Sequence, residues 1–176
     1  MKLLKRLLIG LVVLIALLYG GALLLPSGVT IQRSQAIAAA PDKVYALIAA
    51  PKAWQRWSAW SRRDPAMQVT YTGPESGSGA GWTWKSKTEG DGTMVFTQAT
   101  PPGLLGYDLS FPGFGTSHGD FRVAAQNGGS VVTWSIRMDM SAANPIWRWM
   151  GLFWDKLVGK DFESGLTELK KLAEQG

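Results

Sequence analysis

Cysteine is absent from this chain of 176 residues, and histidine occurs once, at His118. The lack of cysteine excludes disulfide bonds, thiolate metal sites and cysteine nucleophiles. A single histidine cannot supply a cluster of metal ligands. Because no nucleophilic side chain stands beside a base in a recognisable motif, the sequence predicts no metal, no cofactor and no catalytic residue.

Acidic residues are also missing from the start of the chain, where none precedes Asp42. Lys2, Lys5 and Arg6 supply three of the 18 basic residues, so residues 28–176 carry fifteen basic side chains against 13 acidic ones. The net charge of +5 therefore comes mainly from the N-terminus. A nucleic-acid-binding protein carries its basic patch on the folded domain itself, so we expect no nucleic-acid partner.

A long apolar run follows these basic residues. Leu7 to Leu25 contains nineteen residues without charge or proline, and as a helix it would span about 28 Å, close to the hydrocarbon thickness of a bilayer. Residues 20–22 are small, as a signal-peptide cleavage site requires, but a cleaved signal peptide has a shorter apolar core. We therefore favour a membrane anchor that is retained and comprises residues 1–27. The basic flank predicts a cytoplasmic N-terminus. Residues 28–176 would then lie outside the cytoplasmic membrane, in the periplasm of a Gram-negative cell, and close to the bilayer.

Residues 28–176 have the pattern of one domain with strands and helices. Residues 28–37 alternate apolar and polar side chains, which predicts a strand, and residues 41–50 have helical periodicity. A long helix is predicted from residue 144 to the C-terminus. Six further strand-like runs, separated by turns rich in glycine or containing proline, predict an antiparallel sheet built from hairpins: 68–72, 81–89, 92–100, 104–111, 118–126 and 130–140.

Nine tryptophans are more than an ordinary core of this size needs. Tryptophan is common on binding surfaces, in cavity walls and at membrane interfaces as well as in cores. Trp54, Trp57 and Trp60 recur at every third position, so a short helix would place them on one side. We expect at least two of them to pin this segment to the core and Trp60 to line an opening.

Strand alternation predicts an apolar inner face for the sheet. In the run 81–89, Trp82 and Trp84 share one parity, while the lysines and Glu89 share the other. His118 falls on the outer parity, which argues against general-base work inside the domain. The predicted inner face contains no charged residue: Trp82, Trp84, Ser86, Thr88, Met94, Phe96, Gln98, Leu105, Tyr107, Leu109, Phe111, Phe121, Val123, Val132, Trp134, Ile136, Met138 and Met140. Such a face suits a cavity for an apolar ligand, and a packed core would explain the same pattern.

Several segments resemble the START-like (SRPBCC) superfamily, specifically its polyketide cyclase/dehydrase and lipid-transport type. They are AAPDKVYALIAAPKAWQRWSAW, the DPAM turn, GPESGSGAGWTW and MGLFWDKLVGKDFESGLTELK. The resemblance covers residues 29–174. It implies an α+β helix-grip fold, in which a curved antiparallel sheet of about seven strands wraps around the C-terminal helix and encloses a hydrophobic cavity. Family members include carriers, receptors and enzymes, so the resemblance implies the fold more strongly than the activity.

We therefore predict a membrane-anchored protein whose cavity binds a lipid or another hydrophobic small molecule. Two alternatives stay open. A cyclase-type enzyme would need an acid or base beside its substrate, and the inner face offers only Tyr107 and Gln98. A tryptophan-rich module that binds a protein partner at the membrane is the other alternative. The predicted ligand-binding residues are Trp60, Trp82, Trp84, Phe96, Gln98, Tyr107, Leu109, Phe121, Trp134, Met138 and Trp147.

The start of the last helix carries aromatic residues around more of its circumference than one core-facing stripe needs. We therefore expect Trp147 and Trp60 to form a mouth near the bilayer. There Arg62 and Arg63 could meet anionic lipid headgroups, although Arg63 could also pair locally with Asp64 on the surface.

Overall fold

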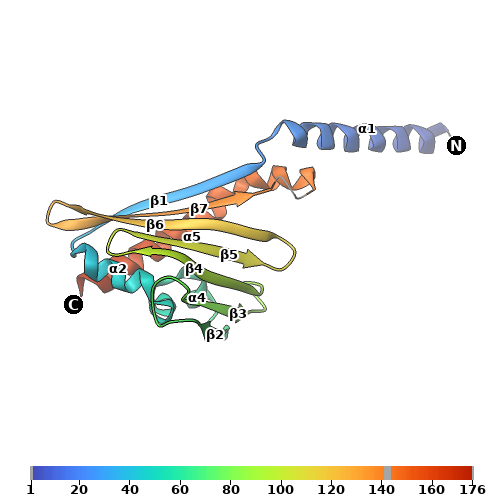
Figure 1. The fold of residues 1–176 in the computed structure, drawn as a ribbon. Coiled ribbons are helices and arrows are strands. Elements are labelled where there is room, and N and C mark those ends of the chain that lie inside the picture. The colour runs from blue at the N-terminus through green and yellow to red at the C-terminus, as the bar shows by residue number, and fades with distance from the viewer. Residues whose placement is uncertain (1, 141–143, 176) are drawn as a thin grey trace.

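The computed structural model describes residues 2–140 and 144–175 of the chain (Figure 1). An N-terminal helix, α1 (Lys2–Leu24), projects from a domain that combines one sheet with several helices. This is the helix-grip architecture that the sequence predicts. In chain order the domain comprises β1 (Gly28–Ile37), α2 (Pro41–Ala49), η1 (Pro51–Ala53), α3 (Trp54–Trp57), α4 (Ala59–Arg63), β2 (Gln68–Thr72), β3 (Gly81–Lys85), β4 (Gly92–Thr100), β5 (Leu104–Phe111), β6 (Gly115–Gln126), β7 (Gly129–Asp139), η2 (Pro145–Trp147) and α5 (Arg148–Glu174).

All seven strands form one antiparallel sheet in the order β1-β7-β6-β5-β4-β3-β2. Strands β2 to β7 are joined in chain order as successive hairpins. Strand β1 forms one edge of the sheet by pairing with β7, where Ile31 lies opposite Ile136. The β6–β7 hairpin turns at Asn127 and Gly128, which both have positive φ angles. Asn-Gly is the sequence that such a two-residue turn favours.

The long helix α5 packs along the inner face of the sheet. Its second half buries Phe162, Leu166, Leu169 and Ala173. Phe162 stacks on Trp134 of β7, with ring centroids 3.8 Å apart and planes inclined by 5°. This contact joins the helix to the centre of the sheet.

An ion-pair cluster fixes α5 to the first strand. Arg33 of β1 donates to Glu163 (Nε to Oε1, 2.6 Å) and to Asp155 (Nη1 to Oδ1, 2.9 Å). The guanidinium lies against Gly159, where a Cβ atom would come within 2.1 Å of Nη2. Gly159 lies within the continuous helix α5. It makes room for the arginine.

Two details of the strands differ from the sequence prediction. The run predicted over 81–89 stops at Lys85, because the Ser86 hydroxyl accepts hydrogen bonds from the backbone amides of Thr88 and Glu89 and folds a turn. In β4 the register shifts between Phe96 and Gln98. A bulge reverses the side-chain parity that follows it, so the prediction that Gln98 faces inward is wrong.

The N-terminal helix α1 is long and apolar enough to cross a membrane, and apart from Ala22 its side chains lie largely outside the protein core. Its last turn contacts the start of α5. The Trp149 indole lies 2.9 Å from the position that a Cβ atom on Gly21 would take, and its Nε1 donates to the Leu18 carbonyl at 3.0 Å. The helix therefore leaves the domain beside η2 and the N-terminal end of α5 (Figure 1).

Candidate functional site

A cavity of about 960 Å³ lies between the inner face of the sheet and the helices α3, α4 and α5. Its volume is in the range of small-molecule sites, about 300–1,000 Å³. Most of its wall is apolar and comes from the sheet (Trp82, Trp84, Met94, Tyr107, Leu109, Trp134, Ile136 and Met138) and from the helices (Trp54, Trp60, Trp154, Val158 and Phe162). Among the described residues, the charged side chains that line it are Arg63, Glu89, Asp91, Lys156, Lys160 and Asp161.

Two tryptophans of the triplet are fixed in the core next to the cavity. Trp54 and Trp57 are buried, and their ring centroids lie 4.4 Å apart. Trp54 Nε1 donates to the Ile48 carbonyl at 2.8 Å, and Trp57 Nε1 donates to the Leu47 carbonyl at 3.2 Å. Because both indole N–H groups bind the end of α2, these rings hold the helical segment against the sheet. Trp60 is half-buried and lines the cavity, as the sequence predicts.

The Tyr107 hydroxyl is a buried polar group of the cavity wall. It accepts a hydrogen bond from Trp134 Nε1 at 2.8 Å and donates to the Ser135 carbonyl at 3.1 Å. The ring crosses Gly119 of β6, where a Cβ atom would come within 2.2 Å of it. Burial raises the pKa of the Tyr107 phenol far above its usual range. The phenol therefore remains protonated and donates its proton in a hydrogen bond to the Ser135 carbonyl. It is poorly placed to act as a general acid or base.

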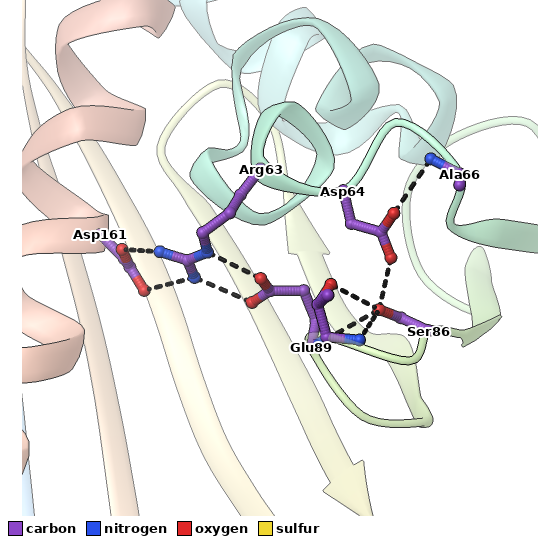
Figure 2. Close-up of polar contacts among 7 residues, drawn as sticks. Arg63, Asp64, Ala66, Ser86, Glu89 and Asp161 are labelled. Atoms are coloured by element: carbon purple, nitrogen blue, oxygen red, sulfur yellow. Dashed lines mark hydrogen bonds and ion pairs between the residues drawn. The ribbon is translucent and has the colours of Figure 1, made fainter.

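Arg63 lines the cavity and bridges two carboxylates of its wall, those of Glu89 and Asp161 (Figure 2). Its guanidinium binds both oxygens of Glu89 at 2.7 and 2.8 Å and both oxygens of Asp161 at 2.9 and 3.1 Å. Glu89 belongs to the β3–β4 turn and Asp161 to α5, so one side chain of α4 joins three separate parts of the wall. Bidentate geometry makes such pairs specific as well as strong.

The predicted local pair between Arg63 and Asp64 is not formed. Asp64 instead accepts hydrogen bonds from the Ser86 hydroxyl at 2.5 Å and from the Ala66 amide at 3.0 Å (Figure 2). The Ser86 hydrogen bond is the main cause that lowers the pKa of the Asp64 carboxyl below its usual range. Ser86, which the alternation placed on the inner face, therefore organises the turn that presents Glu89 to Arg63.

We expect Arg63→Gln to accelerate the release of a bound ligand by up to about thirtyfold. The reason is that partly exposed ion pairs contribute about 1 kcal/mol or less each and Arg63 forms two of them. A difference of about 2 kcal/mol in the stability of the closed wall changes a rate by about this factor. Stopped-flow release of a dansyl-labelled fatty acid measures the effect. Arg62→Gln is the matched control, since Arg62 also binds α5, through Glu168 and Ser164, but does not line the cavity. Equal release rates for both variants would contradict this role of Arg63.

The structure brings most of the predicted ligand-binding residues together. Trp60, Trp82, Trp84, Tyr107, Leu109, Trp134 and Met138 line the cavity. Phe96 and Phe121 face inward but are fully buried behind the wall. Gln98 is exposed beyond the bulge, and Trp147 is also exposed and stacks edge-on with Phe114, at 6.1 Å between ring centroids, outside the cavity wall.

Three features of the site were not predicted. Glu89 was placed on the outer face, and its contact with Arg63 depends on a turn that strand alternation cannot reveal. Asp161 and Arg63 lie 98 positions apart in the chain, so no local pattern pairs them. Phe114, in the β5–β6 turn, lines the cavity although 72% of its surface is exposed. The only indication of this role in the sequence is that an aromatic residue stands in a predicted turn.

The outer face of the sheet carries the single histidine. His118 is exposed, and its Nδ1 lies 2.6 Å from Asp108 Oδ1 on the neighbouring strand. It does not line the cavity, which confirms the predicted outward orientation. Among the residues that the structure describes, no group of three or more His, Cys, Asp or Glu side chains could hold a metal ion.

Comparison with solved structures finds the same fold in proteins of low sequence identity. Protein CV1439 from Chromobacterium violaceum is 14% identical, with a TM-score of 0.59 over 84% of this chain and 98% of that one. The di-domain aromatase/cyclase StfQ from the steffimycin biosynthetic pathway is 12% identical, with a TM-score of 0.64 over 84% of this chain and 52% of StfQ. Ara h 8.0201 is 11% identical, with a TM-score of 0.59 over 85% and 99% of the two chains. At these identities the likeness establishes the fold alone.

No curated protein matches the chain. The sequence model of one protein family does match, over residues 28–174, and that family is described as polyketide cyclase/dehydrase and lipid transport. Since the match covers well over half of the chain, the chain belongs to this family.

Proposed function

We propose that this member of the polyketide cyclase/dehydrase and lipid transport family binds a lipid or another hydrophobic small molecule in its cavity, while α1 anchors it in a membrane. The observation that carries the proposal is the cavity itself. It is large enough for a small-molecule ligand, and its wall is largely aromatic and methionine-containing, with a smaller number of charged side chains. An apolar wall with few polar groups suits a ligand that is mostly hydrocarbon and has one polar end.

The wall supports binding better than catalysis. A cyclase-type reaction would need an acid or base within reach of the substrate. Hydroxyl groups in the cavity wall come from Ser58, Ser61, Tyr107 and Ser117, and that of Tyr107 is already engaged by Trp134 and Ser135. The carboxylates of Glu89 and Asp161 are held by Arg63. A cyclase-like activity is the second candidate, because the family description and the fold shared with StfQ both include it.

The apolar character of α1 supports the membrane anchor. It has 23 residues and is long and apolar enough to cross a bilayer. The charges of Lys2, Lys5 and Arg6 at its start favour a cytoplasmic N-terminus. The domain would then face the outer side of the cytoplasmic membrane.

Two measurements test the two parts of the proposal. For the anchor, carbonate extraction and N-terminal sequencing of the expressed protein should find the full chain in the membrane pellet; a soluble chain that begins near Ser27 would contradict it. For the ligand, energy transfer from the tryptophans of the wall to a dansyl-labelled fatty acid should saturate at one probe per chain in mild detergent. Transfer that rises without saturation would contradict a defined site.

A further inference from the structure

A surface of exposed apolar side chains lies at one end of the domain. It consists of Phe114 in the β5–β6 turn and of Ile146, Trp147, Met150, Phe153 and Leu157 in η2 and the first turns of α5. We call it the end surface. These side chains are between 38% and 72% exposed. A single exposed apolar residue is normal on a protein surface, whereas a contiguous group of large ones marks an interaction site.

The members of the end surface are neighbours in space. Met150, Phe153 and Leu157 recur at intervals of three and four residues, which places them on one stripe of α5. Phe114 reaches this stripe through its ring contact with Trp147. The helical stripe and the turn therefore form one continuous surface.

The end surface lies where α1 leaves the domain. In Figure 1, η2 and the β5–β6 turn lie at the same end of the sheet as the junction with α1. Arg148 approaches the carbonyls of Leu23 and Leu25 at 3.4 Å, which adds a cation to the C-terminal end of α1. These contacts of Arg148 and the hydrogen bond from Trp149 to the Leu18 carbonyl place the end surface next to the point at which α1 would emerge from a bilayer.

The cavity opens within the same surface. Phe114 and Leu157 are both largely exposed and line the cavity. Lys156 and Lys160, beside them on α5, also line it, and neither forms an ion pair with a described residue. An apolar surface bordered by unpaired lysines matches the interface of a bilayer, where hydrocarbon lies beneath anionic headgroups.

We propose that the end surface inserts into the outer leaflet of the same bilayer that α1 spans, so that the cavity opens toward the acyl chains. This interaction rests on the anchor proposed above. It replaces the sequence-based placement of Arg62 and Arg63 at headgroups, because both arginines are bound to carboxylates of the protein. A second copy of the chain, or another protein, would be the competing occupant of this surface.

Single-cysteine labelling tests the proposal on the full chain, because the natural sequence contains no cysteine that would need removal. Phe153→Cys is labelled with the environment-sensitive fluorophore NBD and reconstituted in phosphatidylcholine/phosphatidylglycerol liposomes. We expect a blue-shifted emission that is lost when the acyl chains are brominated. Gln126→Cys, exposed at the β6–β7 turn at the opposite end of the sheet (Figure 1), should keep an aqueous emission that bromination does not quench.

The other outcomes overturn the proposal. Aqueous emission from position 153 would show that the surface faces solvent. Blue-shifted emission without quenching by bromine would show that a protein covers it. Carbonate extraction of the same liposomes keeps the two proposals apart: release of the chain would overturn the anchor as well, whereas a retained chain with an aqueous probe would overturn the end surface alone.

A second variant tests the consequence for ligand exchange without touching the cavity wall. Met150→Asp/Phe153→Asp places charges on the end surface, and neither residue lines the cavity. We expect slower transfer of the dansyl-labelled fatty acid from liposomes to the protein, with unchanged affinity in detergent. Thr167→Asp, exposed on the distal half of α5, is the control. Equal transfer rates for the double variant and the control would overturn the proposed route.

Discussion

Replacement of Trp134 by alanine is expected to lower the free energy of unfolding by about 3–5 kcal/mol, the range found for large aromatic residues in cores. Trp134 is 1% exposed. Its ring lies between Phe162, with centroids 3.8 Å apart, and Phe121, at 4.8 Å. The substitution therefore removes a stacking contact between α5 and the centre of the sheet, and it also leaves the Tyr107 hydroxyl without its indole donor.

Urea unfolding of the detergent-solubilised chain, followed by near-ultraviolet circular dichroism, measures this loss. Trp147→Ala is the control, because Trp147 is 48% exposed and surface substitutions usually change stability by about 0.5 kcal/mol or less. If both variants lost the same amount of stability, the stacking of Trp134 on α5 would not be a main source of the stability of the domain.

The variant Met138→Glu is expected to weaken the binding of the dansyl-labelled fatty acid by at least about tenfold. Met138 lines the cavity and is half-buried, so a carboxylate there can stay hydrated while the cavity is empty. An apolar ligand would exclude that water, and an unpaired buried charge costs well over the 1.4 kcal/mol that corresponds to tenfold in affinity. The fold should survive, because the charge is hydrated in the free protein.

The matched control for this variant is Ala124→Glu, which adds the same charge on the exposed outer side of β6. We expect its affinity for the probe to equal that of the parent. Energy transfer in detergent gives both affinities, and the melting temperatures show whether either variant is unfolded. Unchanged binding by a folded Met138→Glu would place the ligand outside the cavity.

Much of the fold could be predicted because strand alternation is a local property. Trp82, Trp84 and Trp134 each sit among polar neighbours at a period of two, and all three are buried on the inner face. The helix that begins near Pro41 was predicted for a similar reason, since its proline and Val44 occupy positions typical of a first turn and a buried stripe.

The parts that could not be predicted depend on irregularity or on distant partners. Gln98 follows the alternation of its strand in sequence, but the bulge after Phe96 reverses it. Arg63 stands next to Asp64 in the chain, yet its partners come from a turn and from α5. A sequence shows which charges are neighbours along the chain, whereas the pairs that form are decided by how the elements pack.

The excess of tryptophan and the resemblance to the family favoured a cavity, whereas the alternation of the inner face is explained equally by a packed core. What distinguishes the two is the space left between α4, α5 and strands β3–β7. Its volume depends on how far the N-terminal half of α5 stands from the sheet, which no periodic pattern encodes.

Native mass spectrometry of the full chain, extracted from its membrane in mild detergent, tests the central claim most directly. If the cavity binds a hydrophobic molecule, the parent protein and Ala124→Glu should each carry one adduct per chain, and Met138→Glu should be recovered without it. Recovery of all three proteins at the mass of the bare chain, or with the same adduct on Met138→Glu, would contradict the account.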